Sequence, residues 1–173
     1  MRRTMEAFCL GLLAVLFWFT YAALSGPERL PDRIPTHFDG AGQPNAWGSP
    51  GFLWFLPVIA TGVYLLLTVL GSIRFQRFNL PVRVTEANLA FIQDQTILMM
   101  AWIKCEILSL FVYLQWSIIE SARNGAFRLS PLLIPVFLVV IFSTVGWHLV
   151  TLIRGAQMRV QSNSGDQVGD THS

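Results

Sequence analysis

Four long apolar segments constrain the fold of this chain more than any other feature of its sequence. A helix that crosses the hydrocarbon core of a bilayer, about 30 Å thick, needs about 20 predominantly apolar residues. Unpaired backbone polar groups are costly in lipid, so such segments are expected to be helical. The sequence therefore predicts an all-α integral membrane protein with four transmembrane helices, at about residues 5–24, 52–73, 97–119 and 132–153.

The composition agrees with a lipid environment for these segments. Apolar residues make up 53% of the 173 residues and charged residues only 13%, whereas about 25% of the residues in soluble domains are charged. The net charge of +2 is scattered along the chain, which argues against a nucleic-acid-binding surface. Cys9 and Cys105 lie inside apolar segments, so we expect buried thiols rather than a disulfide framework or a zinc site.

The arginines that flank the segments predict the orientation in the membrane, because cytoplasmic flanks carry an excess of basic residues. If the helices alternate in direction, one side receives Arg2, Arg3, Arg74, Arg77, Arg83, Arg154 and Arg159. The other side receives only Arg29, Arg33, Arg123 and Arg128. We therefore expect a multi-pass protein of the bacterial inner (cytoplasmic) membrane, with both termini in the cytoplasm and residues 25–51 outside.

The remaining parts of the chain complete the predicted organisation. Residues 1–160 form the membrane domain, and the polar, Gly- and Ser-rich residues 161–173 are expected to be disordered. A cleaved secretory signal is the alternative for the first segment, but its apolar run exceeds the roughly 7–15 residues of such signals. We expect the connection before the third span to extend the third helix inward as a short surface helix, starting near Thr85 as its N-cap with Asn88 following.

The loop between the first two helices has the composition of a folded cap. Pro31, Pro35, Pro44 and Pro50 prevent a continuous helix. Gly40, Gly42 and Gly48 are expected to allow turns with positive φ. The loop also contains Ile34, Phe38 and Trp47, which a flexible linker does not need. We expect a compact Pro/Gly-rich structure on the outer ends of the helices, with Trp47 at the membrane interface.

The same loop carries a family resemblance. The residues that carry this resemblance are Leu30, Pro31, Asp32, Ile34, Pro35, Thr36, His37, Phe38, Gly42, Pro44, Trp47, Gly48 and Ser49. This string resembles the signature of a bacterial membrane family, the domain of unknown function 1648. The same domain forms the first part of the SdpI-type immunity proteins. In those immunity proteins, the implied role is protection of the producing cell from its own secreted peptide and retention of a repressor at the membrane.

Two departures separate this chain from the family pattern. The resemblance leads us to expect an acidic residue at the position of Asn45 and a basic residue at that of Pro50, so an ion pair of the family loop would be missing here. The immunity proteins also have a further hydrophobic domain, which does not follow in this sequence. The resemblance thus implies a family and not a reaction.

His37 and Asp39 are the residues of the loop most suited to chemistry. Residues two apart on an extended strand share a face, so both side chains could meet one ligand. A metal would need a third donor, for which Asp32 and Glu28 are the nearest candidates. The alternative is that His37 hydrogen-bonds backbone carbonyls and organises the turn. With a single histidine in the loop, we expect no bound metal or other cofactor.

Ionisable residues inside the spans form a second group of candidates, because such residues are costly in lipid. Lys104, Glu106 and His148 all fall in the inner half of the bilayer by their positions in the third and fourth spans. We expect Lys104 to extend its ammonium group toward the inner headgroups. Glu106 is expected to face the helix bundle and contact His148, as a structural bond or as a proton or ligand relay.

Polar residues also form stripes that predict helix–helix hydrogen bonds. The stripes comprise Glu106, Ser109, Tyr113 and Ser117 on the third span, Thr144, His148 and Thr151 on the fourth, and Thr61, Thr68 and Ser72 on the second. Pro57 and Pro135 are expected to bend their helices near the outer ends and open a shallow cavity under the loop.

Three hypotheses for the function follow. The first is a non-enzymatic sensing, binding or immunity-type protein whose outer loop binds a peptide or envelope component or which holds a cytoplasmic regulator. The candidate ligand-binding residues are then Pro35, His37, Phe38, Asp39, Gly42 and Trp47. The second is a small transporter or accessory subunit that uses Glu106 and His148. The third, a metal-dependent membrane enzyme, would need metal at His37 and Asp39. The sequence leaves the oligomeric state open.

Overall fold

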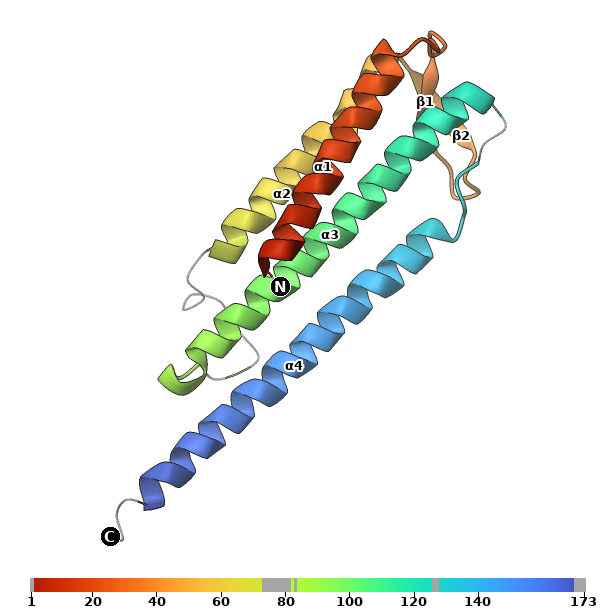
Figure 1. Cartoon of the computed structure of the whole chain (residues 1–173). Helices are drawn as coiled ribbons and strands as arrows, with labels where there is room; N and C mark the ends of the chain where they lie inside the picture. Colours follow the sequence, from red (N-terminus) through yellow and green to blue (C-terminus); the bar gives the residue numbers. More distant parts are fainter. Residues whose placement is uncertain (1, 73–81, 83, 126–127, 170–173) are drawn as a thin grey trace.

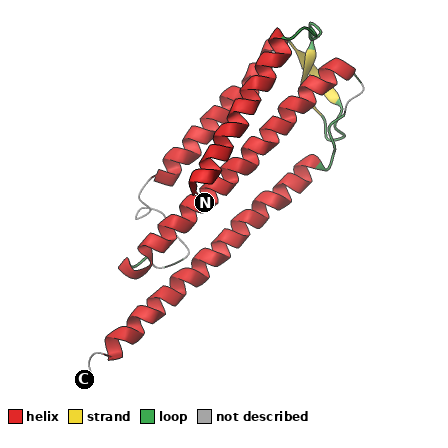
Figure 2. Ribbon diagram, in the orientation of Figure 1, coloured by secondary structure: helices red, strands yellow, loops and turns green. Residues whose placement is uncertain are grey.

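The computed structural model describes residues 2–72, 82, 84–125 and 128–169. Within them, four helices are long and apolar enough to cross a membrane, which confirms the predicted multi-pass architecture (Figures 1 and 2). In chain order the elements are α1 (Arg2–Ser25), β1 (Ile34–Phe38), β2 (Pro44–Gly48), the 3-10 helix η1 (Pro50–Trp54), α2 (Phe55–Ser72), α3 (Glu86–Asn124) and α4 (Leu133–Gly169).

The helices extend beyond the predicted spans. The second span is divided between η1 and α2, which ends at Ser72, and residues 73–81 with Arg74 and Arg77 lie outside the described residues, as does Arg83. Helix α3 has 39 residues, which at 1.5 Å per residue gives a length of about 58 Å. A bilayer core of about 30 Å covers only part of this length, so α3 projects beyond it.

The early start of α3 follows from its N-cap. Thr85 is extended and precedes the helix, and its backbone N–H donates to Asn88 Oδ1 at 2.8 Å. This contact confirms the predicted N-cap, and the helix that it begins is continuous with the third span, as expected for an inward extension. Helix α3 ends at Gly125, whose left-handed backbone (φ 59°) places its N–H 3.0 Å from Ser121 O.

Helix α4 is longer than expected at its C-terminal end. Its backbone is helical through Gly169, which differs from the disorder predicted for residues 161–173. No proline follows Pro135 in the chain, so no residue removes a backbone donor from the helix. Residues 170–173, including His172, lie outside the described residues.

Helix α3 is the central element of the fold. It packs against α1, α2, α4 and β1, and α4 runs along it on the side away from α1 and α2 (Figure 1). The hairpin lies at one end of the bundle, and the two chain ends point toward the opposite end (Figure 1). This arrangement agrees with helices that alternate in direction.

Apolar clusters hold this bundle together at three levels. The clusters comprise Cys9, Leu13, Leu16, Ala60, Cys105 and Leu108 in the middle, Ala23, Ile34, Leu53, Ile118 and Ile119 at the hairpin end, and Ile92, Leu152 and Ala156 at the opposite end. Near the hairpin end the fully buried Gln115 adds two hydrogen bonds: its Nε2 donates to Thr20 Oγ1 at 2.7 Å and to Leu53 O at 3.0 Å. One side chain thus joins α1, η1 and α3.

The outer loop is a folded cap, as predicted. Strands β1 and β2 pair antiparallel, with Ile34 opposite Gly48 and His37 opposite Ala46, and the register shifts around His37. Ile34 and Pro35 are fully buried, and Ile34 packs with Leu53 and Ile118. Burial of these apolar side chains against η1 and α3 fixes the hairpin on the bundle.

The turn of the hairpin is fixed by Gly42. Its φ is +75°, as predicted, and its carbonyl accepts a hydrogen bond from Leu129 N–H at 2.9 Å. A Cβ atom at this position would lie 1.7 Å from Leu129 O. The prediction of positive φ is wrong for Gly40 and Gly48, since Asp39 and Gly42 together complete the turn. Gly48 instead allows a close approach of Thr36, whose Cγ2 would be 2.8 Å from an added Cβ.

Substitution of Gly42 by alanine is expected to detach the hairpin from the segment before α4. The strained φ and the clash with Leu129 should lower the free energy of unfolding by about 3 kcal/mol. Unfolding of the purified protein in mixed detergent micelles measures this change. Gly40→Ala is the matched control, because a Cβ there meets nothing within 4 Å. Equal stability of the two variants would contradict the assigned role of Gly42.

Candidate functional site

A cavity of about 560 Å³ lies between the hairpin and the ends of α2, α3 and α4 that are nearest to it. The hairpin contributes His37, Phe38 and Asp39, and the helices contribute mainly apolar side chains such as Leu56, Leu114, Ile118 and Ile134. The volume is within the range of small-molecule and side-chain binding pockets, roughly 300–1,000 Å³. The structure thus brings four of the six predicted loop candidates to one cavity: these three residues and Gly42.

His37 and Asp39 also organise the hairpin itself. His37 Nδ1 lies 2.5 Å from Asn45 Oδ1, a contact between the two strands. Asp39 Oδ1 accepts hydrogen bonds from the backbone N–H groups of Ala41 at 2.9 Å and Gln43 at 2.8 Å. The histidine is therefore bound to a side-chain amide rather than to the backbone carbonyls that the sequence suggested. Asn45, which replaces the expected acidic residue, still supplies an acceptor oxygen.

The predicted third metal donor is not supplied. Among the residues that the structure describes, no three His, Cys, Asp or Glu side chains lie close enough together to hold a metal ion. The other loop candidates have separate positions. Pro35 is buried beneath the hairpin, whereas Trp47 is 47% exposed on β2 and its carbonyl accepts from Arg33 Nη2 at 3.2 Å.

The prolines that were expected to open a cavity differ in their positions. Pro135 lines the cavity beneath the hairpin. Pro57 is buried in α2, and its carbonyl accepts a hydrogen bond from Thr61 Oγ1 at 2.8 Å. The cavity is thus formed by the docked hairpin and the ends of α2, α3 and α4, and Pro57 does not line it.

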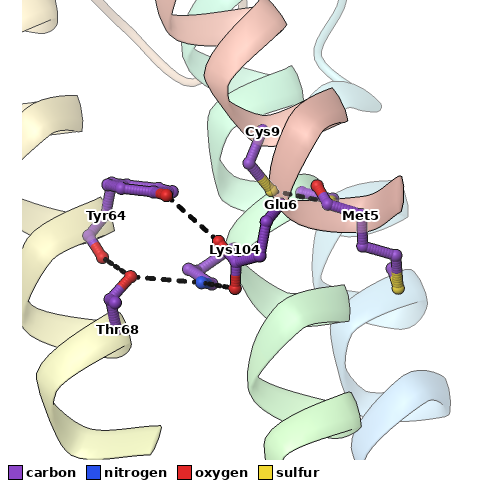
Figure 3. A network of polar contacts seen from close by, with 7 residues as sticks. Met5, Glu6, Cys9, Tyr64, Thr68 and Lys104 are labelled. Carbon is purple, nitrogen blue, oxygen red and sulfur yellow. Dashed lines mark hydrogen bonds and ion pairs between the residues drawn. The ribbon is translucent and has the colours of Figure 1, made fainter. Parts of the chain in front are cut away.

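A second group of polar residues lies within the membrane-spanning part, around Lys104 (Figure 3). The Lys104 side chain is 3% exposed and forms an ion pair with Glu6 of α1. Its Nζ also donates to Thr68 Oγ1 at 3.1 Å and lies 4.9 Å from the centre of the Tyr64 ring. Tyr64 in turn donates to Glu6 Oε2 at 3.1 Å. The network joins α1, α2 and α3.

This network corrects the prediction that Lys104 reaches the inner headgroups. Glu6 sits at the start of α1, at the level of Lys104 on the neighbouring helix, so the ammonium group finds a carboxylate without leaving the bundle. The sequence did not identify Glu6, Tyr64 or Thr68 as partners of Lys104. One signal was available: Glu6 is the only acidic residue of the first segment, and Lys104 is the only lysine of the chain.

Next to this network, the two cysteines meet. Cys9 and Cys105 are free and buried, as predicted, and their Sγ atoms are 2.8 Å apart. Cys105 Sγ also lies 3.7 Å from Met5 O. Their proximity shows that α1 and α3 approach closely at this level.

On the other side of α3, Glu106 faces α4. Its Oε1 accepts a hydrogen bond from the Thr144 hydroxyl, and the predicted contact with His148 is an electrostatic interaction without a hydrogen bond between Glu106 Oε2 and His148 Nδ1. Glu106 Oε2 and His148 Nδ1 are both buried, and neither has a hydrogen-bond partner within the described part of the chain. The register of α3 and α4 explains the correction, because Thr144 lies one helical turn from His148.

The remaining predicted stripes form fewer bonds between helices than expected. Thr61, Thr68, Ser72 and Thr151 donate to carbonyls of their own helices, a common arrangement for hydroxyl side chains in helices. Thr68 additionally accepts from Lys104. Ser109 and Tyr113 line the same cavity as Glu106.

Comparison with known proteins places the hairpin in a recognised domain. Residues 9–61 match the family model described as "Domain of unknown function (DUF1648)", which confirms the resemblance to this domain. An uncharacterized protein of Archaeoglobus fulgidus is 30% identical over 70 residues. The aligned part spans 40% of this chain and 38% of the archaeal protein. No solved structure matches the chain.

Loss of the Lys104 ammonium group is expected to destabilise the bundle strongly. Lys104→Met leaves the Glu6 carboxylate without its cation in a largely buried position, which should cost about 3 kcal/mol of unfolding free energy. The double variant Glu6→Gln/Lys104→Met should recover most of this loss, because no unpaired charge remains. A double-mutant cycle in mixed micelles measures both values.

The exposed ion pair between Arg123 and Glu28, with 3.7 Å between its atoms, provides the control for this cycle. Arg123→Met should change stability by less than about 0.5 kcal/mol. If Lys104→Met were equally mild, the buried pair would not hold the helices together.

Proposed function

We propose that this is a non-enzymatic membrane protein that binds an extracytoplasmic ligand in the cavity beneath its hairpin. The observation that carries the proposal is the position of the cavity, between the folded hairpin and the ends of three helices. A ligand there would contact residues from distant parts of the chain at once. Such a site is suited to sensing or sequestration, since binding would change how the hairpin sits on the bundle.

The chemistry of the cavity favours an amphipathic peptide as the ligand. Its walls carry the aromatic side chains of Phe38, Phe52 and Phe55, which suit an apolar side chain. Asp39 lines the same cavity and supplies an acidic group beside these apolar walls. The resemblance of the hairpin to SdpI-type immunity proteins supports a secreted, membrane-active peptide as the natural partner.

The proposal requires the hairpin to lie outside the cytoplasm, as the arginine distribution predicts. A periplasmically active reporter inserted after Gly40 should therefore be active, and the same reporter fused behind Gly169 should be inactive. Alkaline phosphatase activity in intact cells, corrected for fusion abundance, measures the difference. Activity only at the C-terminal fusion would invert the orientation and contradict the proposal.

Filling the hairpin cavity should abolish the proposed function. Leu114→Trp introduces a large ring from α3 into the cavity. Cells that produce the wild-type protein should tolerate several-fold higher concentrations of at least one secreted membrane-active peptide in a panel, and cells producing Leu114→Trp should lose this tolerance. Growth inhibition, measured at matched protein abundance in the membrane, provides the comparison.

Leu138→Trp is the control for this experiment. Leu138 is 45% exposed on α4 and does not line the cavity, so tolerance should be kept. A wild-type protein that protects against no peptide of the panel would contradict the immunity role, and a protective Leu114→Trp variant would contradict the cavity as the site.

A second candidate function is a small transporter or an accessory subunit of one. The observation that favours it is the buried, unpartnered Oε2 of Glu106 in the middle of the bundle, within the described residues. Polar groups of this kind mark substrate and proton pathways in membranes. The two candidates differ in their sensitive residue: transport should fail with Glu106→Gln and tolerate Leu114→Trp.

A further inference from the structure

A second cavity, of about 620 Å³, follows the seam between α3 and α4 below the hairpin. Its walls are almost entirely apolar, with Leu110 of α3 and Val136, Phe137 and Val140 of α4 among them. Phe8 of α1 and Val136 are each 57% exposed, and in a spanning bundle such surfaces face lipid. A molecule dissolved in the bilayer can therefore reach the cavity from the side.

This apolar cavity contains one acidic side chain. Glu106 lines it, and the Thr144 hydroxyl donates a hydrogen bond to Glu106 Oε1. Oε2 is buried and has no hydrogen-bond partner among the described residues. A carboxylate in apolar surroundings is costly unless a cation or hydrogen-bond donor meets it. The missing partner of Glu106 is therefore a donor, and a cationic donor would compensate the charge as well.

No described basic group donates a hydrogen bond to Glu106 Oε2, although His148 interacts with the Glu106 carboxylate electrostatically. Lys104 is committed to Glu6 on another side of α3, and neither ion pair between described residues involves Glu106. His148 lines a neighbouring cavity of about 520 Å³, which shares Trp102 with the α3–α4 cavity that Glu106 lines. Its Nδ1 forms no hydrogen bond to Glu106 within the described residues.

The cavity extends along the α3–α4 seam toward the hairpin. At its outer end it shares Ser130 and Leu133 with the cavity beneath the hairpin, so apolar space continues from Glu106 toward the outer leaflet. An aliphatic chain that extends from Glu106 along the seam would bury its methylene groups against α3 and α4. Burial of each methylene contributes about 0.8 kcal/mol relative to water.

We propose that the α3–α4 seam binds an amphiphile with an aliphatic chain and one protonated amine, with the ammonium group donating to Glu106 Oε2. The chain lies against the apolar walls, and the molecule enters sideways from the bilayer. This site is separate from the proposed hairpin site, because its acidic residue and most of its walls belong to α3 and α4.

Binding of dodecylamine to the full chain tests the proposal. The protein is reconstituted in nanodiscs of phosphatidylcholine, whose headgroups carry no net charge, and radiolabelled dodecylamine is titrated with protein-free nanodiscs as background. Wild-type protein should bind about one equivalent above this background. Glu106→Gln should weaken binding at least about tenfold, the effect expected for loss of a charge-assisted hydrogen bond. Glu86→Gln, an exposed acidic residue at the start of the same helix, should leave binding unchanged.

Two further comparisons keep the test decisive if Glu106→Gln does not fold. Labelled 1-dodecanol has the same chain without the charge, and the wild-type protein should bind it at least about tenfold more weakly than the amine. Val140→Trp should fill the cavity and abolish amine binding while Glu106 is intact. Its neighbour Val139 is 66% exposed and does not line the cavity, so Val139→Trp should bind normally.

Three results would overturn the proposal. These are equal binding of amine and alcohol by the wild-type protein, unchanged amine binding by Glu106→Gln, and normal binding by Val140→Trp. The first two would show that the seam accepts an ordinary acyl chain without use of the carboxylate. None of the substituted residues lines the hairpin cavity. A negative result here therefore does not affect the interpretation of the peptide-tolerance experiment.

Discussion

The parallel pairing of α1 with α3 is the contact on which the rest of the structure depends. Polar bonds fix it at two levels: Glu6 meets Lys104 toward the inner end, and Thr20 meets Gln115 toward the hairpin. In lipid the hydrophobic effect does not select one helix rotation over another, so packing and polar contacts of this kind set the register. Once α3 is oriented by α1, its other faces are committed to α2, α4 and the hairpin.

This orientation divides the polar residues of α3 between two roles. Lys104 points into the contact with α1 and α2, where all its bonds are to protein groups. Glu106, two residues later, points toward α4, where half of its carboxylate lacks a partner among the described residues. Helix α3 thus carries one ionisable side chain whose bonds hold the bundle together and another that can still accept a hydrogen bond from a ligand.

Much of this fold could be predicted from the sequence, because its signals are local. Apolar length marks the four spans, the Thr85 and Asn88 spacing marks the start of α3, and prolines with aromatic residues mark the folded cap. The partners of Lys104 and Glu106 could not be predicted in this way, since they depend on how neighbouring helices are rotated and offset. The same applies to the helical backbone of residues 161–169, whose polar composition suggested disorder.

The hydrogen bond between Gly42 and Leu129 has a consequence for biosynthesis. The hairpin is synthesised between the first two helices, but the donor that fixes its turn follows α3 in the chain. Chains are made from the N-terminus at about 5–20 residues per second, so α1, the hairpin and α2 wait several seconds for this contact. The cap is therefore completed only when the segment before α4 arrives, and a ribosome-bound chain truncated before Leu129 would lack the hydrogen bond that fixes the turn of the hairpin.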